Sequence, residues 1–179
     1  MTPTISTLPH LPPHGLKLVL LQPHIAPNTG NIARTCVASG TELHLVRPLG
    51  FVLSDKNLRR SAMDYWRHLR LTVHDDSGAF FDFAARSGES LWLFSSAGEK
   101  SIWQTQFTQN DWLIFGSETS GISPQIKAQY PDRIVRIPQV PDQRCLNLAS
   151  AASIALFEAL RQIQSGTMAP AADPQRGEL

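Results

Sequence analysis

The stretch WLIFGSETSG, residues 112–121, has the pattern of a short apolar strand that runs into a tight polar loop. The residues after it begin like a helix, so the segment predicts a strand, a loop and a helix in succession. Its glycines have the spacing of a phosphate-binding loop, but Ile122 stands where that loop needs a lysine, and the fingerprint GxGxxG is absent. The segment therefore predicts a strand end that holds a ligand by means other than a phosphate loop.

Two interpretations of this loop remain open from the residues alone. Gly116 would let a ligand approach the backbone, and Glu118 would then offer that ligand a carboxylate. Alternatively, Glu118 caps the helix that follows or pairs with a nearby arginine, which is the more common use of such a residue.

Short apolar runs recur along the chain and are separated by helical or mixed stretches. In residues 31–40, for example, Ile32, Cys36 and Val37 recur at helical spacing before a glycine. The runs of strand length are residues 17–21, 43–46, 91–94, 112–115 and 133–137. Strands that alternate with helices predict an α/β fold with a mostly parallel sheet and helices on both faces.

The longest helical pattern runs from Leu146 to Ile163. It contains neither glycine nor proline, and Gly166 follows as a stop signal. Its alanines and serines allow close packing, either in the core or against a second subunit, and the sequence leaves both uses open.

The two ends of the chain differ in composition from its centre. Residues 1–15 contain four prolines and have neither the basic start nor the apolar core of a secretory signal. Residues 165–179 are small, polar and proline-bearing. We expect flexible tails at 1–15 and 165–179 and a single domain at 16–164, since 179 residues are too few to argue for two domains.

Composition excludes several classes of protein. With 42% hydrophobic and 17% charged residues the chain is of globular type, and no run approaches the roughly 18 apolar residues of a membrane span. Cys36 and Cys145 are the only cysteines, so we expect no disulfide framework and a cytoplasmic location. The histidines show no HExxH or other paired spacing, which disfavours a metal site. A net charge of +1 gives no overall attraction to nucleic acid.

The loop at residues 22–34, QPHIAPNTGNIAR, follows a predicted strand and is richer in polar residues than a turn requires. Asn28 or Thr29 can cap the next helix, and Gly30 permits an unusual turn. Capping does not explain Arg34, whose spacing from Asn28 could bring both side chains to one site. Ligands bind outside the carboxyl ends of the strands in such sheets, so this loop is a candidate.

The loop at residues 137–151, IPQVPDQRCLNLASA, is stiffened by two prolines and leads directly into the last helix. Asn147 could cap that helix or bond a ligand. Cys145 has no histidine near it in sequence, so we expect it to line a site rather than to act as a nucleophile.

Basic and aromatic residues gather at residues 55–71. They are Lys56, Arg59, Arg60, Tyr65, Trp66, Arg67, His68 and Arg70. Cations suit phosphates and ring faces suit unstacked bases, so the segment is a candidate RNA surface. An ordinary solvated helix face is the more common use of such a pattern.

Taken in order, PNTGNIAR (27–34), FGSETSG (115–121) and IPQVPDQRCLNLASAASIALFEALRQ (137–162) resemble the three motifs of the SPOUT superfamily of RNA ribose 2′-O-methyltransferases. The segment LRRSAMDYWRHL (58–69) and the short chain are most similar to the tRNA (cytidine/uridine-2′-O)-methyltransferases, which act on the wobble nucleotide. The likeness covers residues 17–162, and three motifs in the right order make it specific.

The resemblance implies a deep trefoil knot in the C-terminal part, which binds S-adenosylmethionine in a bent conformation without a metal. It also implies a homodimer, in which the asparagine and arginine of the first motif commonly reach the partner's site, and a tRNA anticodon stem-loop as substrate. The residues matched to cofactor contacts are Phe94, Gly116, Ile137 and Cys145. The residues matched to the methyl group and target ribose are Asn28, Arg34, Glu118 and Asn147. The expected RNA contacts are Arg59, Arg60, Tyr65 and Arg67.

Two positions depart from the family pattern, which commonly has serine at Cys145 and asparagine at Ser150. Methylation at another tRNA or rRNA position, and a catalytically weak module that binds S-adenosylmethionine and RNA, remain as alternatives. An α/β enzyme that acts on a small molecule is a third.

Overall fold

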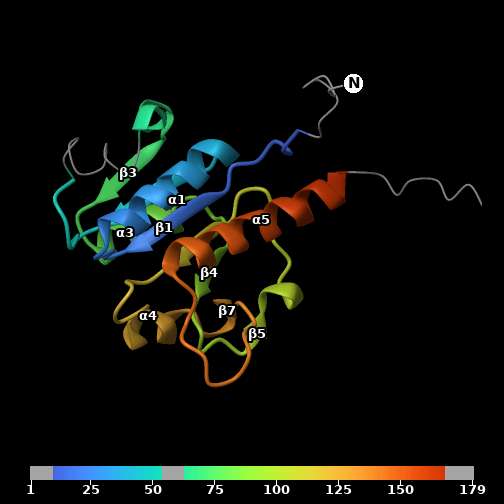
Figure 1. The fold of residues 1–179 in the computed structure, drawn as a ribbon. Helices are drawn as coiled ribbons and strands as arrows, with labels where there is room; N and C mark the ends of the chain where they lie inside the picture. Colours follow the sequence, from blue (N-terminus) through green and yellow to red (C-terminus); the bar gives the residue numbers. More distant parts are fainter. Residues whose placement is uncertain (1–9, 54–62, 168–179) are drawn as a thin grey trace, which may run out of the picture.

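The fold was obtained as a computed structural model, which describes residues 10–53 and 63–167. Within these residues the chain forms a seven-stranded sheet in the order β3-β2-β1-β6-β4-β7-β5 (Figure 1). Every strand pairing in it is parallel. The strands are β1 (Lys17–Leu21), β2 (Glu42–Val46), β3 (Leu71–His74), β4 (Leu91–Phe94), β5 (Lys100–Ser101), β6 (Trp112–Phe115) and β7 (Ile134–Arg136).

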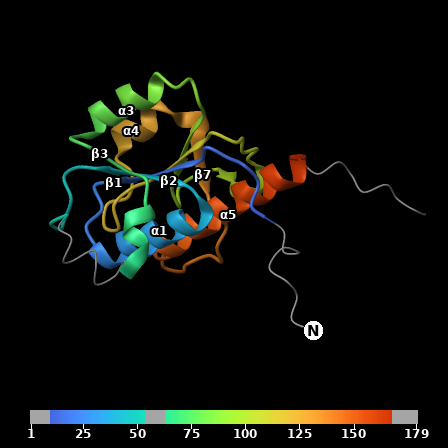
Figure 2. The ribbon, with the colours of Figure 1, turned by 90° about the horizontal axis from the view of Figure 1, so that it is seen from above.

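Helices cover both faces of this sheet, which confirms the predicted α/β fold. The α-helices are α1 (Ala26–Ser39), α3 (Ser77–Ala85), α4 (Pro124–Gln129) and α5 (Leu148–Thr167), and the 3₁₀ turns are η2 (Met63–His68), η3 (Ile102–Gln104) and η4 (Pro131–Arg133). Viewed from above, α1 and α5 lie together on one side of the sheet, while α3 and α4 lie on the other (Figure 2). None of the described helices combines the length and apolar character needed to cross a membrane.

Alternation along the central strand β1 explains the two layers. Leu18 and Leu20 point into the core beneath α1 and α5, whereas Val19 and Leu21 point into the core beneath α3. Successive side chains of a strand face opposite sides of the sheet, so a strand buried on both faces reads as a continuous apolar run. The run KLVLL therefore predicted both a strand and its central place in the layers.

The first and last helices differ in extent from their predicted ranges. Helix α1 begins at Ala26, with a proline in its first turn, so Asn28 and Thr29 lie inside the helix instead of capping it. Helix α5 begins at Leu148 and continues through Gly166, so that glycine is not the stop that the sequence predicted. A glycine weakens a helix by only about 1 kcal/mol, and one in a terminal turn does not end it.

The order of the strands determines where ligands can bind. β1 pairs with both β2 and β6, so the loops after β1 and β6 leave the sheet side by side. The chain order reverses between these two strands, and the carboxyl ends of parallel strands on either side of such a reversal form a crevice.

Candidate active site

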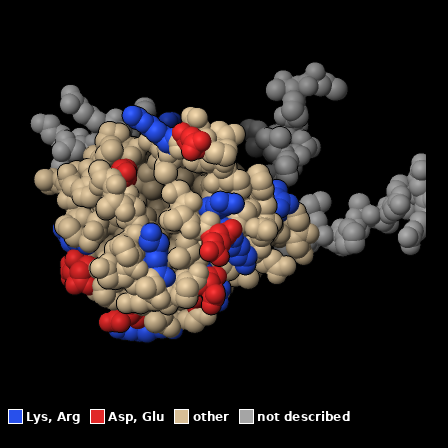
Figure 3. Space-filling view, turned by 90° about the horizontal axis from the view of Figure 1, so that it is seen from below, with Lys and Arg blue, Asp and Glu red and all other residues tan. Residues whose placement is uncertain are grey.

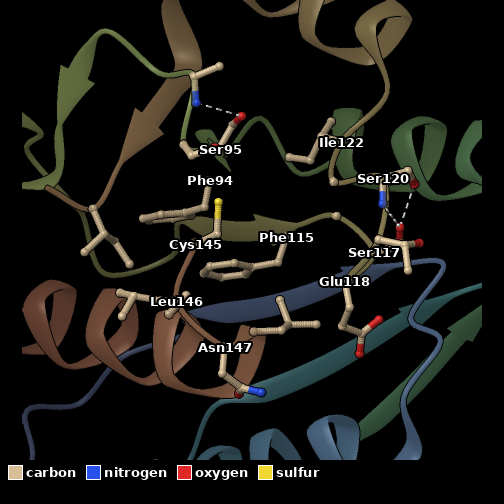
Figure 4. A pocket seen from close by; sticks show the side chains of 18 of the residues that line it. Phe94, Ser95, Phe115, Ser117, Glu118, Ser120, Ile122, Cys145, Leu146 and Asn147 are labelled. Atoms are coloured by element: carbon tan, nitrogen blue, oxygen red, sulfur yellow. Dashed lines mark hydrogen bonds between the residues drawn. The ribbon is translucent and has the colours of Figure 1, made fainter. Parts of the chain in front are cut away.

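A pocket of about 570 Å³ lies at the carboxyl ends of β4, β6 and β7 (Figure 4). Its walls come from residues 94–97, 115–122 and 137–148, and the start of α1 closes one side. All of the sequence-predicted cofactor positions line it, as do three of the four residues matched to the methyl group and ribose. These lining residues are Phe94, Gly116, Ile137, Cys145, Asn28, Glu118 and Asn147.

One wall of the pocket is apolar and partly aromatic. The rings of Phe94 and Phe115 stack at 4.7 Å between centroids and 10° between planes. Ile137, Cys145 and Leu146 line the same pocket. Such a surface suits a planar heteroaromatic ring, because flat rings bury apolar area against it without losing hydrogen bonds.

The polar wall is a chain of three side chains that begins at Glu118. Asn28 Nδ2 donates to Glu118 Oε1 at 3.0 Å, and Asn147 Nδ2 donates to Asn28 Oδ1 at 3.0 Å. Figure 4 shows Glu118 and Asn147 on the same side of the pocket, away from Ser95. These contacts join the first turn of α1 to the loops after β6 and β7, so the two asparagines and the carboxylate form one polar cluster.

Glu118 caps a helix, but a different helix from the predicted one. Its carboxylate accepts the backbone N–H groups of His24 at 2.8 Å and Ile25 at 3.2 Å, which lie immediately before α1, with Ile25 as its N-cap residue. The helix after its own loop, α4, is capped instead by Ser123, which accepts from the Ile126 N–H. Glu118 thus ties the loop after β6 to the N-terminus of α1, where an anionic group is favourable.

The hydrogen bonds also set the charge of Glu118. Burial alone raises the pKa of this carboxyl, but the His24 amide, the Asn28 side chain and further backbone amides outweigh burial and hold the pKa below its usual value. An ionised carboxylate that already accepts several hydrogen bonds is a weak base. The environment of Glu118 suits positioning of Asn28 better than proton abstraction.

Asn147 caps α5, which is one of the two roles that its sequence left open, and its contact with a ligand stays a prediction. Its Oδ1 accepts the Ala149 N–H at 2.8 Å, and its carbonyl accepts the Ala151 N–H at 2.9 Å, as expected of the cap of α5. Its amide nitrogen is used for Asn28. Both ends of the Asn147 amide are therefore fixed by hydrogen bonds.

The glycines of the loop after β6 are required by the loop itself. A Cβ atom on Gly116 would lie 2.0 Å from the carbonyl carbon of Gly121, so the two backbones touch. Gly121 has φ +64°, and its N–H donates to the Ser117 carbonyl at 3.0 Å. Gly116 therefore makes room for the returning chain, and it also lines the pocket, so the approach of a ligand to its backbone stays a prediction.

Arg34 does not reach the pocket within one chain. It lies six residues after Asn28, about 240° around the helix, and it is exposed while Asn28 is buried at 6% exposure. Arg34 is not among the residues that line this pocket, so a site shared by Asn28 and Arg34 stays a prediction that involves a second subunit.

The candidate RNA segment is described only in part. Arg59 and Arg60 lie outside the described residues, as does the side chain of Tyr65, while Arg67 is exposed at the end of η2. Trp66, by contrast, is half-buried and packs on the core. On the face seen from below, the described acidic and basic side chains are interspersed and do not gather by sign (Figure 3).

The sequence did not predict several of the residues that line the pocket. Among the described lining residues that were not predicted, Lys127 is the only charged one. It belongs to α4, one turn and a half beyond the glycine loop. Its place directly after that loop was the available signal, since short helices after a strand-end loop stay close to it. No group of three or more metal-ligating side chains occurs among the described residues.

A model of the SpoU rRNA methylase family matches residues 15–157. The chain belongs to this family. Within the SpoU family, a putative tRNA (cytidine(34)-2′-O)-methyltransferase of Synechocystis sp. is 48% identical over 151 residues, which cover 84% of this chain and 98% of the relative.

Solved structures of SpoU proteins have the same fold. One from a study of the 2-OH methylation of C/U34 on tRNA superposes with a TM-score of 0.81 at 43% identity, covering 87% of this chain and 99% of the other. The SpoU methyltransferase AviRb of Streptomyces viridochromogenes, solved in complex with AdoMet, superposes with a TM-score of 0.71 at 26% identity. The match covers 89% of this chain and 61% of the AviRb chain.

Proposed function

We propose that this protein is an S-adenosylmethionine-dependent tRNA methyltransferase that modifies the ribose 2′-hydroxyl of cytidine or uridine at the wobble position. Similarity to the Synechocystis relative over 98% of its length supports this substrate. The observation that carries the proposal is the hydrogen-bonded cluster of Asn28, Glu118 and Asn147 beside an apolar pocket. A tRNA substrate and two free cysteines are consistent with a cytoplasmic enzyme.

The pocket fits the cofactor in size and in lining. Its volume of about 570 Å³ lies within the range of small-molecule sites, roughly 300–1,000 Å³. Phe94, Ile137 and Cys145 would hold the adenine and sugar, and the backbone around Gly116 would offer hydrogen bonds. When bound, the cofactor supplies a methyl group on a positively charged sulfur.

We further propose that residues 16–164 belong to one domain, which helix α5 extends to Thr167, and that its C-terminal part is threaded as a deep trefoil knot. Supporting this, β7 lies between β4 and β5, although it follows both in sequence. The segments before and after β7 also meet at one pocket. An experimental chain trace would test the threading.

The polar cluster would position the ribose. Methyl transfer needs the 2′-oxygen in line with the breaking bond between sulfur and carbon, so orientation supplies most of the rate enhancement. The amides of Asn28 and Asn147 have fixed orientations and would bond the ribose hydroxyls. Arg34 would clamp the adjacent phosphate with its forked guanidinium and polarise the hydroxyl, and the proton would leave to a neighbouring group or to water.

A homodimer would bring Arg34 to a pocket. Helices α1 and α5 lie side by side, joined by a hydrogen bond of 3.2 Å between Thr35 and Ser153. On α5, Ile154 and Phe157 are 44% and 50% exposed, and their spacing of three residues puts them on one helix face as an apolar stripe. Pairing of two such faces would bury the stripe and place Arg34 of one subunit near the pocket of the other.

The segment around Arg59, Arg60, Tyr65 and Arg67 is proposed to contact the anticodon stem-loop. Arginine contacts to phosphate make affinity fall as salt rises, because counterions are released on binding. Substitutions of Arg59 and Arg60 should therefore reduce turnover on tRNA. If they leave turnover unchanged, a small-molecule substrate becomes the better interpretation.

Methyl transfer from labelled S-adenosylmethionine to unmodified tRNA tests the function. The nucleoside is identified by mass spectrometry, and a tRNA with a 2′-deoxy wobble nucleotide serves as the matched control. Ribose-methylated C or U with unmodified tRNA, and no product with the control, is the expected result. Label at another nucleotide would reassign the target, and cofactor binding without transfer would indicate a catalytically weak module.

A further inference from the structure

The pocket contains one positive charge that the proposed reaction has not used. Among the described residues that line it, Glu118 and Lys127 are the only charged side chains. Glu118 accepts hydrogen bonds from two backbone amides and from Asn28. Its negative charge is therefore already satisfied, and nothing in the cluster requires Lys127.

Lys127 is half-buried on α4, and its backbone is held inside that helix. Its N–H donates to the Ser123 carbonyl at 3.1 Å, and its carbonyl accepts the Tyr130 N–H at 3.2 Å. Within the described residues, its side-chain ammonium has neither an ion pair nor a hydrogen bond. Removing a charge from water costs free energy unless a partner replaces the water.

The other described lysines differ from Lys127 in this respect. Lys17 Nζ lies 2.5 Å from Glu89 Oε2. Lys100 Nζ lies over the ring of Trp92, 5.1 Å from the centroid. Both side chains thus have partners within the fold. Lys127, by contrast, is a half-buried residue with an unpaired ammonium that lines the pocket, and an anionic group on a ligand would complement that charge.

We propose that Lys127 binds the α-carboxylate of the methionine moiety of the cofactor. This inference rests on the proposed use of S-adenosylmethionine, whose methionine end carries the one carboxylate of the molecule. An ion pair in a partly enclosed pocket is worth more than one in open water, and charge-assisted hydrogen bonds are the stronger kind. Lys127 would thereby distinguish the intact cofactor from fragments without the amino acid.

The test compares two ligands in the absence of RNA. Isothermal calorimetry measures binding of S-adenosylhomocysteine, which has the carboxylate, and of 5′-methylthioadenosine, which lacks it. We expect Lys127→Gln to weaken S-adenosylhomocysteine by roughly tenfold or more and to leave 5′-methylthioadenosine unchanged. Lys127→Arg, which keeps the charge, should recover most of the affinity.

Lys100→Gln is the matched control, because it removes the same charge from a half-buried lysine outside the pocket. It should bind both ligands as the unchanged protein does, and thermal melts check that each variant is folded. Equal loss of both ligands in Lys127→Gln, or no loss of either, overturns the proposal. Loss of tRNA affinity alone would also overturn it and assign Lys127 to an RNA phosphate. If the unchanged protein binds neither ligand, the proposed cofactor itself is wrong.

Discussion

Glu118 determines the orientation of the side-chain amides of Asn28 and Asn147, although it contacts only Asn28. Its carboxylate can only accept, so the Asn28 amide must present Nδ2 to it and Oδ1 to Asn147. Asn147 then presents Oδ1 to the Ala149 N–H. One acceptor at the end of the chain thus sets the donor and acceptor pattern that a ribose would meet.

Glu118→Gln tests this role at the scale of one residue. The variant keeps the size of the side chain but turns an NH₂ group toward donors, so one hydrogen bond is lost and the α1 cap weakens. We expect the free energy of unfolding, measured in urea, to fall by about 1–3 kcal/mol. We also expect kcat to fall while cofactor affinity changes little. Glu99→Gln, on an exposed side chain, is the control. Equal stability of the two variants would contradict the capping role.

Sequence reasoning located Asn28, Glu118 and Asn147 because each follows a strand in a parallel sheet, and such ends meet. Arg34 is not among the residues that line the pocket of its own chain, so its role at the site stays a prediction that involves a partner subunit. Sequence reasoning missed Lys127, which lies on a helix and carries no motif. Contacts between segments distant in sequence, such as Glu118 with His24, leave no local pattern.

At the scale of elements, the turn between β6 and α4 depends on Gly116. Gly116→Ala would put a methyl group against the Gly121 backbone, which has no flexible atoms that could move aside. We expect the variant to lose roughly 1–3 kcal/mol of stability and to bind cofactor weakly, measured by denaturation and calorimetry. Gly166→Ala, where nothing lies within 4 Å, should be neutral or stabilising. Equal stability of Gly116→Ala and Gly166→Ala would contradict a close approach between the backbones at Gly116 and Gly121.

The strands of the structure that the sequence predicted are those with apolar runs. All five predicted strands, β1, β2, β4, β6 and β7, lie near their predicted ranges. Four of them, β1, β2, β4 and β6, are almost wholly buried, and strands buried on both faces read as apolar runs. β3 mixes Thr72 and His74 with apolar residues at the sheet edge, and β5 has only two residues. Neither has enough apolar residues to be recognised by pattern, and the order of the strands is not encoded in any of them.

At the scale of the whole molecule, subunit mixing tests the proposed dimer. If Arg34 serves the partner's pocket, a mixed dimer of Arg34→Ala and Asn147→Ala subunits contains one intact site. We expect each variant alone to be nearly inactive and the mixture to regain part of the activity. A mixture as inactive as its components would place Arg34 in its own subunit's site.

Disruption of the apolar stripe gives an independent check on the dimer. Phe157→Arg should produce a monomer in sedimentation with reduced turnover, whereas Phe83→Arg, on an exposed ring of α3, should leave a dimer. A fully active Phe157→Arg monomer would exclude the interface.

Stability should also depend on pH through a buried histidine pair. His44 Nδ1 lies 2.9 Å from His74 Nε2, and burial lowers the pKa of His44 from 6.5 to about 4. The unfolded chain therefore binds the proton more tightly, so stability is full above pH 6.5 and falls as the pH falls toward 4. We expect a loss of about 2 kcal/mol between pH 7 and pH 5.

Urea titrations of the unchanged protein and of His44→Gln at both pH values measure this loss. The variant should show a smaller difference between pH 7 and pH 5, even if it is less stable throughout. Exchange of exposed His10 for Gln should leave the difference as it was. Equal pH dependence in His44→Gln and the unchanged protein would contradict the assignment.

The strand order also determines when each strand can pair as the chain emerges from the ribosome. Until residues 112–115 have been released, β1 has only β2 beside it, and its other edge stays open for pairing. The pocket needs residues as late as Ala151, so an incomplete nascent chain has no place for a ligand. A ligand can therefore rescue a finished molecule from unfolding, but it cannot help to guide the early stages of synthesis.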